Sequence, residues 1–259
     1  MRNILLLGDL HCGSTEGLWH PDFVTREGQR IKLSPLQEEL YEKWLLLRER
    51  LPDYEAVFLL GDITHGLGSK EFGKDVIDCD LHDQLQCAIK LLKPVTKGKK
   101  VVVITGSRYH SSIDYDIDRG LAEVLHAKFG GAISNIRLKG TDVVINIAHG
   151  IGSRPVYTGT RMNQDVFNAI LTEHLLKMPE VSVIIRAHFH IFSYFAIYGK
   201  HFIYIPGWNA IRKGRFVTRW YFRQPDIGAV LLSIDNDNNV YVKPYLFKLK
   251  SERKNICVL

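Results

Sequence analysis

Residues 4–11 of the chain run Ile4-Leu5-Leu6-Leu7-Gly8-Asp9-Leu10-His11: four apolar residues, a glycine, and two side chains that can bind a metal ion. A short, unbroken apolar run of this kind predicts a strand buried on both faces, as in the sheets of α/β proteins. Asp9 and His11 are two positions apart, and an extended backbone would direct both to the same side. The stretch therefore predicts a central strand that ends in a pair of metal ligands.

The same pattern recurs three times further along the chain. Apolar runs at 56–60, 143–148 and 181–186 end in metal-capable side chains, namely Asp62, His149, and His188 with His190. Open α/β sheets build their binding sites at such strand ends. Carboxylates combined with imidazoles suit transition metals better than Mg²⁺. Two Asp and four His therefore indicate a hydrolase site with two metal ions, which activate water and offset charge on the substrate.

The chain has 259 residues, enough for one large α/β domain, and we expect a single domain over 1–259. Strands and helices alternate up to about residue 186, and the last third contains only hairpins. The predicted helices are 35–51, beginning at the N-cap Ser34 with Pro35 in the first position, 75–93, ended by Pro94, 118–129, and 163–177. The predicted hairpins are 193–205 and 227–247.

The bulk composition indicates which kind of substrate and which cellular compartment to expect. The formal net charge is +6 and the pI is near 9.0, which mildly favours anionic substrates. Four cysteines without CxxC spacing argue against a disulfide framework or a zinc knuckle. No apolar stretch reaches the length of a membrane span, and the first apolar run is too short for a signal peptide. We therefore expect a cytoplasmic protein with no membrane partner.

Asp9-x-His11, Gly61-Asp62, His149-Gly150 and His188-x-His190, in this order, resemble the motifs of the calcineurin-like metallophosphoesterases. The resemblance covers positions 8–190. It implies a four-layer α/β/β/α sandwich of mixed sheets and two divalent transition-metal ions, with Mn²⁺ as the first expectation and Fe, Zn or Ni as alternatives. It also implies the ligand roles: Asp9, His11 and His190 on the first metal, Asp62 as the bridge, and His149 and His188 on the second metal.

One motif departs from the family pattern. The third strand of the family is usually followed by Gly-Asn-His and an acid, whereas this chain has Gly106-Ser107-Arg108-Tyr109-His110. A similar Gly-(Thr/Ser)-x-x-His variant occurs in phage-type members, which this chain resembles in length and layout. We favour His110 as the general acid that protonates the leaving oxygen, oriented by Asp114 or Asp116. Alternatively, His110 takes the place of the missing Asn on the second metal, a place that water or Ser107 could also fill.

Two features near the predicted ligands have either a functional or an ordinary structural interpretation. His65 lies three residues after Asp62 in a glycine-rich loop, so it is a candidate to face the site. The carboxylates of Asp75, Asp78, Asp80 and Asp83 are expected to form a solvated face of the predicted helix, with lining of the cleft as the less favoured alternative.

The substrate is suggested by three arginines. Arg154 follows His149, and Arg215 and Arg219 belong to the stretch 212–223, which interleaves basic and aromatic residues. Guanidinium groups hold phosphates and aromatic rings stack on bases, although the aromatics could equally pack on the core beneath solvated cations. We expect a two-metal phosphoesterase acting on phosphodiesters of nucleic acid or nucleotides. The alternatives are a phosphomonoesterase, a protein phosphatase, or a non-catalytic binding scaffold of the same fold.

Overall fold

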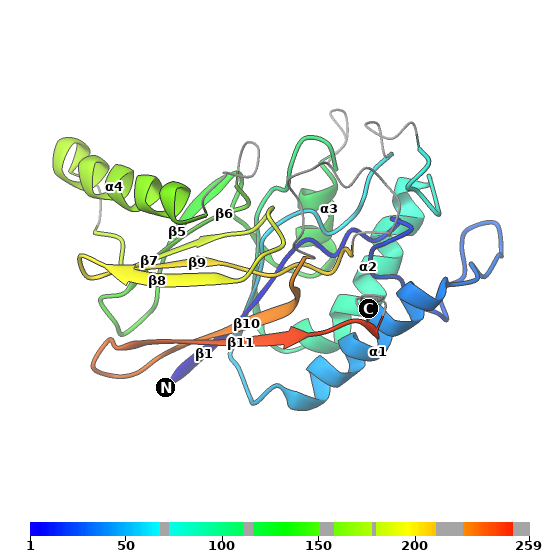
Figure 1. Ribbon diagram of the computed structural model, residues 1–259, viewed down its shortest axis with the longest axis horizontal. Coiled ribbons are helices and arrows are strands. Elements are labelled where there is room, and N and C mark those ends of the chain that lie inside the picture. Colours follow the sequence, from blue (N-terminus) through cyan, green and yellow to red (C-terminus); the bar gives the residue numbers. More distant parts are fainter. Residues whose placement is uncertain (68–72, 111–115, 151–157, 178–179, 211–224, 251–259) are drawn as a thin grey trace, which may run out of the picture.

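The computed structural model describes residues 1–67, 73–110, 116–150, 158–177, 180–210 and 225–250, and the strands in these residues form two sheets (Figure 1). The first sheet has the order β11 (Val240–Phe247), β10 (Ile227–Ile234), β1 (Arg2–Leu7), β2 (Ala56–Leu59), β3 (Lys100–Val103) and β4 (Lys128–Phe129). The second has the order β5 (Ile133–Arg137), β6 (Val144–Ala148), β7 (Val183–Arg186), β9 (Lys200–Tyr204) and β8 (Ser193–Ile197). Both sheets are mixed, because their central strands pair in parallel while antiparallel strands lie at one edge of the first sheet and at both edges of the second.

Side chains of β1 alternate between two apolar layers. Ile4 and Leu6 pack into the core between the two sheets, whereas Leu5 and Leu7 pack against the helices on the outer face. That outer face is covered by α1 (Pro35–Arg50), α2 (Leu81–Thr96) and α3 (Ile117–Val124). Helix α4 (Thr158–Leu176) covers the outer face of the second sheet through Met162 and Val166. The expected four-layer α/β/β/α sandwich is confirmed.

Helix α1 follows the sequence prediction closely. The Ser34 hydroxyl accepts a hydrogen bond from the Gln37 N–H, and the Gln37 side chain accepts one from the Ser34 N–H, which completes a capping box. Pro35 occupies the first turn, where a missing N–H has no consequence.

Helix α2 corrects the predicted helix 75–93 at both ends. It begins at Leu81, where the Asp80 side chain accepts hydrogen bonds from two backbone N–H groups of the first turn. It also continues through Pro94 to Thr96, because Leu92 and Val95 keep the last turn packed in the core despite the backbone hydrogen bond that a proline removes.

The carboxylates near this helix do not share the solvated face that we expected. Asp75 lies before the helix, in a segment that pairs with the N-terminal loop through Thr15 N–H to Asp75 O and Ile77 N–H to Gly13 O. Asp83 is buried and accepts a hydrogen bond from the Arg26 N–H. Pairing between distant loops has therefore replaced the expected helical start.

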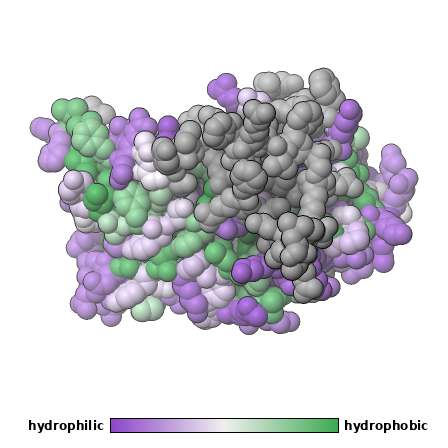
Figure 2. Space-filling model, viewed as in Figure 1, coloured by the Kyte–Doolittle hydropathy of each residue, from purple (hydrophilic) through white to green (hydrophobic). Residues whose placement is uncertain are grey.

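The predicted helix 118–129 is shorter in the structure. Helix α3 ends at Val124, His126 adopts a left-handed backbone with φ 51°, and Lys128–Phe129 pair with β3 as a short parallel strand. Helix α4 begins five positions earlier than the predicted Asn163. Its outer side carries exposed Phe167, Leu171 and Leu175 at intervals of four, and apolar surface appears over α4 in Figure 2.

None of the helices in the described residues has both the length and the apolarity needed to cross a membrane.

Candidate metal centre

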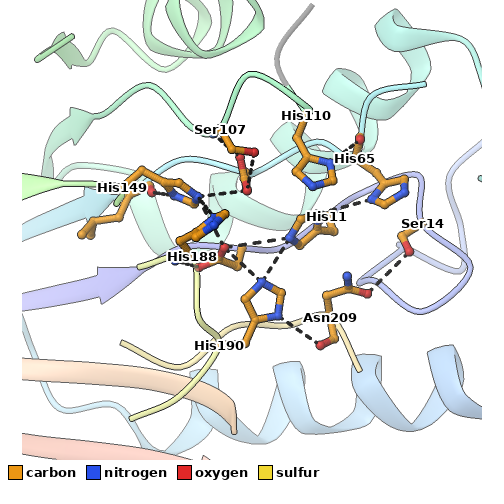
Figure 3. A network of polar contacts seen from close by, with 12 residues as sticks. His11, Ser14, His65, Ser107, His110, His149, His188, His190 and Asn209 are labelled. Carbon is orange, nitrogen blue, oxygen red and sulfur yellow. Dashed lines mark hydrogen bonds and ion pairs between the residues drawn. The ribbon is translucent and has the colours of Figure 1, made fainter. Parts of the chain in front are cut away.

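Loops at the ends of four strands bring the six predicted ligand residues together (Figure 3). The strands β1 and β2 of the first sheet lead to Asp9, His11 and Asp62, and β6 and β7 of the second lead to the remaining three. The residues fall into two groups, and within each group the potential ligand atoms lie within 4.8 Å of one another. One group is Asp9, His11 and His190; the other is Asp62, His149 and His188.

The first group surrounds a buried carboxylate oxygen. Asp9 is fully buried, and its Oδ1 atom lies 3.1 Å from Nε2 of His190 and 3.9 Å from Nε2 of His11. Its Oδ2 accepts a hydrogen bond from the His188 N–H, but Oδ1 receives none of good geometry from the described residues. A buried carboxylate oxygen without a hydrogen bond is costly unless a cation compensates it, so this orphaned atom fits a metal ligand.

The second group is oriented by the backbone of the first sheet. Nε2 of His149 lies 3.0 Å from Oδ2 of Asp62 and 3.2 Å from Nδ1 of His188. Nδ1 of His149 donates a hydrogen bond to the Leu60 carbonyl at 2.6 Å, which leaves Nε2 facing the group. Metal-binding histidines are usually oriented in this way by a backbone carbonyl or a carboxylate.

Five of the six ligand candidates have a left-handed backbone. The φ angles are 51° at Asp9, 47° at His11, 49° at Asp62, 75° at His188 and 51° at His190. The extended geometry that we assumed for Asp9 and His11 is therefore wrong: the chain turns sharply there, and the turn itself aims both side chains at one group. Such backbone is uncommon for residues other than glycine and is concentrated at functional sites.

The electrostatics of the centre favour positive charge. Burial alone lowers the pKa of His149, but the carboxylates of Asp62 and Asp9 outweigh it and raise the pKa to about 10. Burial would raise the pKa of Asp62, yet His149 and the other nearby histidines hold it well below its usual value. A carboxylate held in its ionised form inside a ring of imidazoles thus suits the binding of cations.

Ser107 contacts the candidate bridging residue from the position of the missing Asn. Its N–H donates to Oδ1 of Asp62 at 2.6 Å and its hydroxyl donates to Oδ2 at 3.1 Å. Gly106 lies so close to Asp62 that a Cβ at position 106 would overlap the Asp62 carboxylate and backbone nitrogen. The loop 106–107 therefore fixes the Asp62 side chain in place.

His110 lies beside the first ligand group. Its ring centroid is 4.4 Å from that of His11, and its Nδ1 donates a hydrogen bond to the His65 carbonyl at 2.6 Å. Among the described residues it groups with His11 and His65 as a possible cation site, not with the second ligand group. Asp116 caps α3 by accepting a hydrogen bond from the Arg119 N–H, and Asp114 lies outside the described residues.

His65 faces the centre from behind His11, as the sequence suggested. Nδ1 of His65 lies 3.3 Å from Nδ1 of His11, and Nε2 of His65 lies 3.0 Å from Oδ2 of Asp75. For Asp75 the less favoured alternative, a place near the site, agrees with this contact, but the contact with His65 was not foreseen because it depends on the pairing of residues 73–77 with the N-terminal loop.

A further buried acid lies near the second group. Asp118, at the start of α3, accepts a hydrogen bond from the Gly106 N–H at 2.8 Å. Burial raises the pKa of Asp118 to about 7, and the Asp62 carboxylate adds to the effect. The three arginines proposed to bind substrate, Arg154, Arg215 and Arg219, lie outside the described residues.

Comparisons with known proteins give only distant similarities. No protein-family model matches the chain, and no curated protein matches it. Solved structures with some similarity include a novel archaeal phosphodiesterase (TM-score 0.47, 10% identity, 94% of this chain and 99% of that chain). Another is wild-type Vps29 from Entamoeba histolytica complexed with zinc (0.45, 14%, 95% and 99%), and a third is a predicted phosphoesterase from Streptococcus pneumoniae (0.38, 14%, 95% and 98%). The fold and the site described above rest on the strand order, the layers and the side-chain geometry, not on these similarities.

Proposed function

We propose that residues 1–259 form one metal-dependent phosphoesterase domain. In this proposal Asp9, His11 and His190 hold one divalent cation, His149 and His188 hold a second, and Asp62 bridges the two. The observation that carries the proposal is the pair of adjacent, largely buried ligand groups assembled from four separate loops. Such a pair of cations would lower the pKa of a water molecule and offset charge on the phosphoryl oxygens.

The side chains of this chain then divide the remaining work. Ser107 holds the Asp62 carboxylate through two hydrogen bonds, and the Leu60 carbonyl orients His149. His110, with its Nδ1–H on the His65 carbonyl, would carry a proton on Nε2 and give it to the leaving oxygen. Its grouping with His11, away from the second ligand group, supports this acid role over that of a ligand to the second metal.

The proposed substrates are phosphodiesters of nucleic acid or nucleotides. The net charge of +6 supports an anionic substrate, and Arg154, Arg215 and Arg219 remain the proposed phosphate contacts. Phosphomonoesters and phosphoproteins would suit the same centre. Mn²⁺ is the first proposed metal, with Fe, Zn or Ni as alternatives, and the free thiols of Cys12, Cys79 and Cys87 support a cytoplasmic setting.

Metal analysis combined with an activity screen tests the proposal. We expect about two transition-metal ions per wild-type chain, and hydrolysis of an aryl phosphodiester that falls about 100-fold or more in Asp62→Ala, because the metal pair supplies several kcal/mol of charge stabilisation. Glu42→Gln, an exposed change on α1, is the matched control and should keep both properties.

The second candidate is a non-catalytic scaffold, favoured by Ser107 in the place of the usual Asn. A wild-type chain that holds no metal after purification and cleaves no mono-, di- or cyclic phosphate ester with any of several divalent metals would support the scaffold over the enzyme.

A further inference from the structure

Three side chains in a row, Asp75, His65 and His11, lead from the half-buried Asp75 to the first ligand group. Oδ2 of Asp75 lies 3.0 Å from Nε2 of His65, and Nδ1 of His65 lies 3.3 Å from Nδ1 of His11. The other nitrogen of His11, Nε2, faces the first group, 3.3 Å from Nε2 of His190. In Figure 3, His11 lies between His65 on one side and His188 and His149 on the other.

The positions of the protons on His11 and His65 follow from which nitrogen of His11 faces the first ligand group. If Nε2 of His11 is to give its lone pair to a cation, the proton of the neutral ring must be on Nδ1. Two N–H groups cannot face each other across 3.3 Å, so Nδ1 of His65 must be the acceptor and its proton must be on Nε2. That proton then points at the Asp75 carboxylate, which can only accept when ionised.

We propose that Asp75 and His65 are positioning residues that fix the tautomer and orientation of His11 and thereby raise its affinity for the first metal ion. The inference rests on the proposed function, since it assigns outer partners to one of the proposed ligands. A carboxylate behind an imidazole raises its basicity, and here one imidazole transmits that effect to the next.

The surroundings hold this pair rigidly. His65 is buried, and its N–H and that of Gly66 both donate to Oε1 of Gln84, at 3.1 and 2.8 Å. Asp75 is fixed by the backbone hydrogen bond from Thr15 to its carbonyl. A partner held in this way orients His11 without losing side-chain entropy when a cation binds.

A third cation is the competing explanation for the same geometry. His11, His65 and His110 together offer nitrogen atoms within 4.8 Å of one another. A cation there would take Nδ1 of His11 while Nε2 serves the first group, so the ring would have to lose both protons. A hydrogen bond satisfies the same 3.3 Å contact with neutral rings, and for this reason we favour it.

Metal titration of single variants provides the first test. By calorimetry with Mn²⁺ alone, His65→Ala should weaken one of the two sites by about 10–100-fold and leave the other unchanged. Asp75→Asn keeps an acceptor but removes the charge, so its loss should be smaller than that of Asp75→Ala. His65→Gln, whose amide can accept from His11, should recover part of the affinity. The exposed His82→Gln on α2 is the control and should match wild type.

The wild-type protein provides a second test that does not depend on any variant folding. In the zinc-loaded protein, two-bond ¹H–¹⁵N correlations should show His65 protonated on Nε2 only and His11 on Nδ1. Two results would overturn the positioning role of Asp75 and His65 while leaving the metal centre intact. One is His65 protonated on Nδ1, and the other is a His65→Ala variant with both sites at wild-type affinity.

The stoichiometry separates the remaining outcomes. If the wild-type chain binds three metal ions and His65→Ala binds two, the third cation site is the correct explanation and the positioning role is not. Wild-type protein that binds no metal would instead refute the proposed function itself.

Discussion

Asp62 is held from two sides by the loop that follows β3. Ser107 binds both of its carboxylate oxygens, and Gly106 lies against its backbone. The candidate bridge is therefore positioned by a loop from a different strand, and the glycine is needed for close approach rather than for an unusual φ.

We expect Gly106→Ala to displace Asp62 and to reduce bound metal from about two ions per chain to one or none. The added Cβ would overlap the Asp62 carboxylate and backbone nitrogen. Elemental analysis after dialysis measures the effect. Gly159→Ala, where a Cβ meets no atom within 4 Å, is the control and should retain the metal; equal metal contents in the two variants would contradict the steric argument.

The proposed acid His110 can be distinguished from a metal ligand by one substitution. His110→Ala should lower kcat by about 100-fold or more, the usual contribution of a general acid, while bound metal stays at the wild-type level. A substrate with a very acidic leaving group should lose much less activity, because its oxygen needs no proton. If the variant loses a metal ion instead, His110 is a ligand.

Asp118 predicts a pH dependence of stability. Its pKa is about 7 in the folded chain against an ordinary value of 3.8, so the folded state keeps a proton that the unfolded chain has lost between these values. Stability of the metal-free protein should therefore fall as pH rises from about 4 to 7, by up to roughly 4 kcal/mol relative to Asp118→Asn, and change little above that range. Urea unfolding of both proteins at several pH values measures this difference in stability. The same pH dependence of the unfolding free energy in both proteins would rule out the role of Asp118.

At the scale of single elements, α4 is attached to the second sheet by a buried ion pair. Nζ of Lys200, on β9, lies 2.8 Å from both carboxylate oxygens of Glu173 and also donates to the Val181 carbonyl. Lys200 is only 3% exposed, so its charge depends on Glu173 for compensation.

Glu173→Ala should destabilise the protein by about 3–5 kcal/mol, because it leaves a buried ammonium group without its counter-ion. The double variant Glu173→Leu with Lys200→Met should recover most of that loss, since it removes the stranded charge as well. The free energy of unfolding in urea measures both. Equal losses in the single and double variants would show that packing, not charge, fixes α4.

The elements that could be predicted are those determined by local sequence. Ser34 and Pro35 mark the start of α1, and β10 and β11 together span the predicted hairpin 227–247. The errors lie where tertiary contacts override local preference: core packing carries α2 past Pro94, and pairing with β3 converts 128–129 from helix to strand. The grouping of the six ligand candidates could be expected because they follow apolar strands, whereas the contact of Asp75 with His65 could not, since it depends on contacts between loops.

At the scale of the molecule, the ligand candidates come from both sheets. Asp9, His11 and Asp62 follow strands of the first sheet, and the other three follow strands of the second. Bound cations would therefore stabilise the folded state only when both sheets are in place.

Metal binding should accordingly raise the melting temperature. At a free metal concentration 100 times Kd, one site adds about 2.7 kcal/mol, or about 5–10 °C for a chain of this size. The shift in melting temperature is measured by thermal unfolding without Mn²⁺, with Mn²⁺, and again after a chelator has been added. Asp62→Ala should lose most of it, and an undiminished shift in that variant would place the stabilising ion elsewhere.

The origin of the ligands in two facing sheets has one more consequence. A cation held by both sheets is a cross-link across the seam between them, so its arrival should restrain the opening of that edge of the sandwich. Amide protons at the carboxyl ends of β1, β2, β6 and β7 would then exchange more slowly with solvent, a signal of occupancy that needs neither substrate nor turnover.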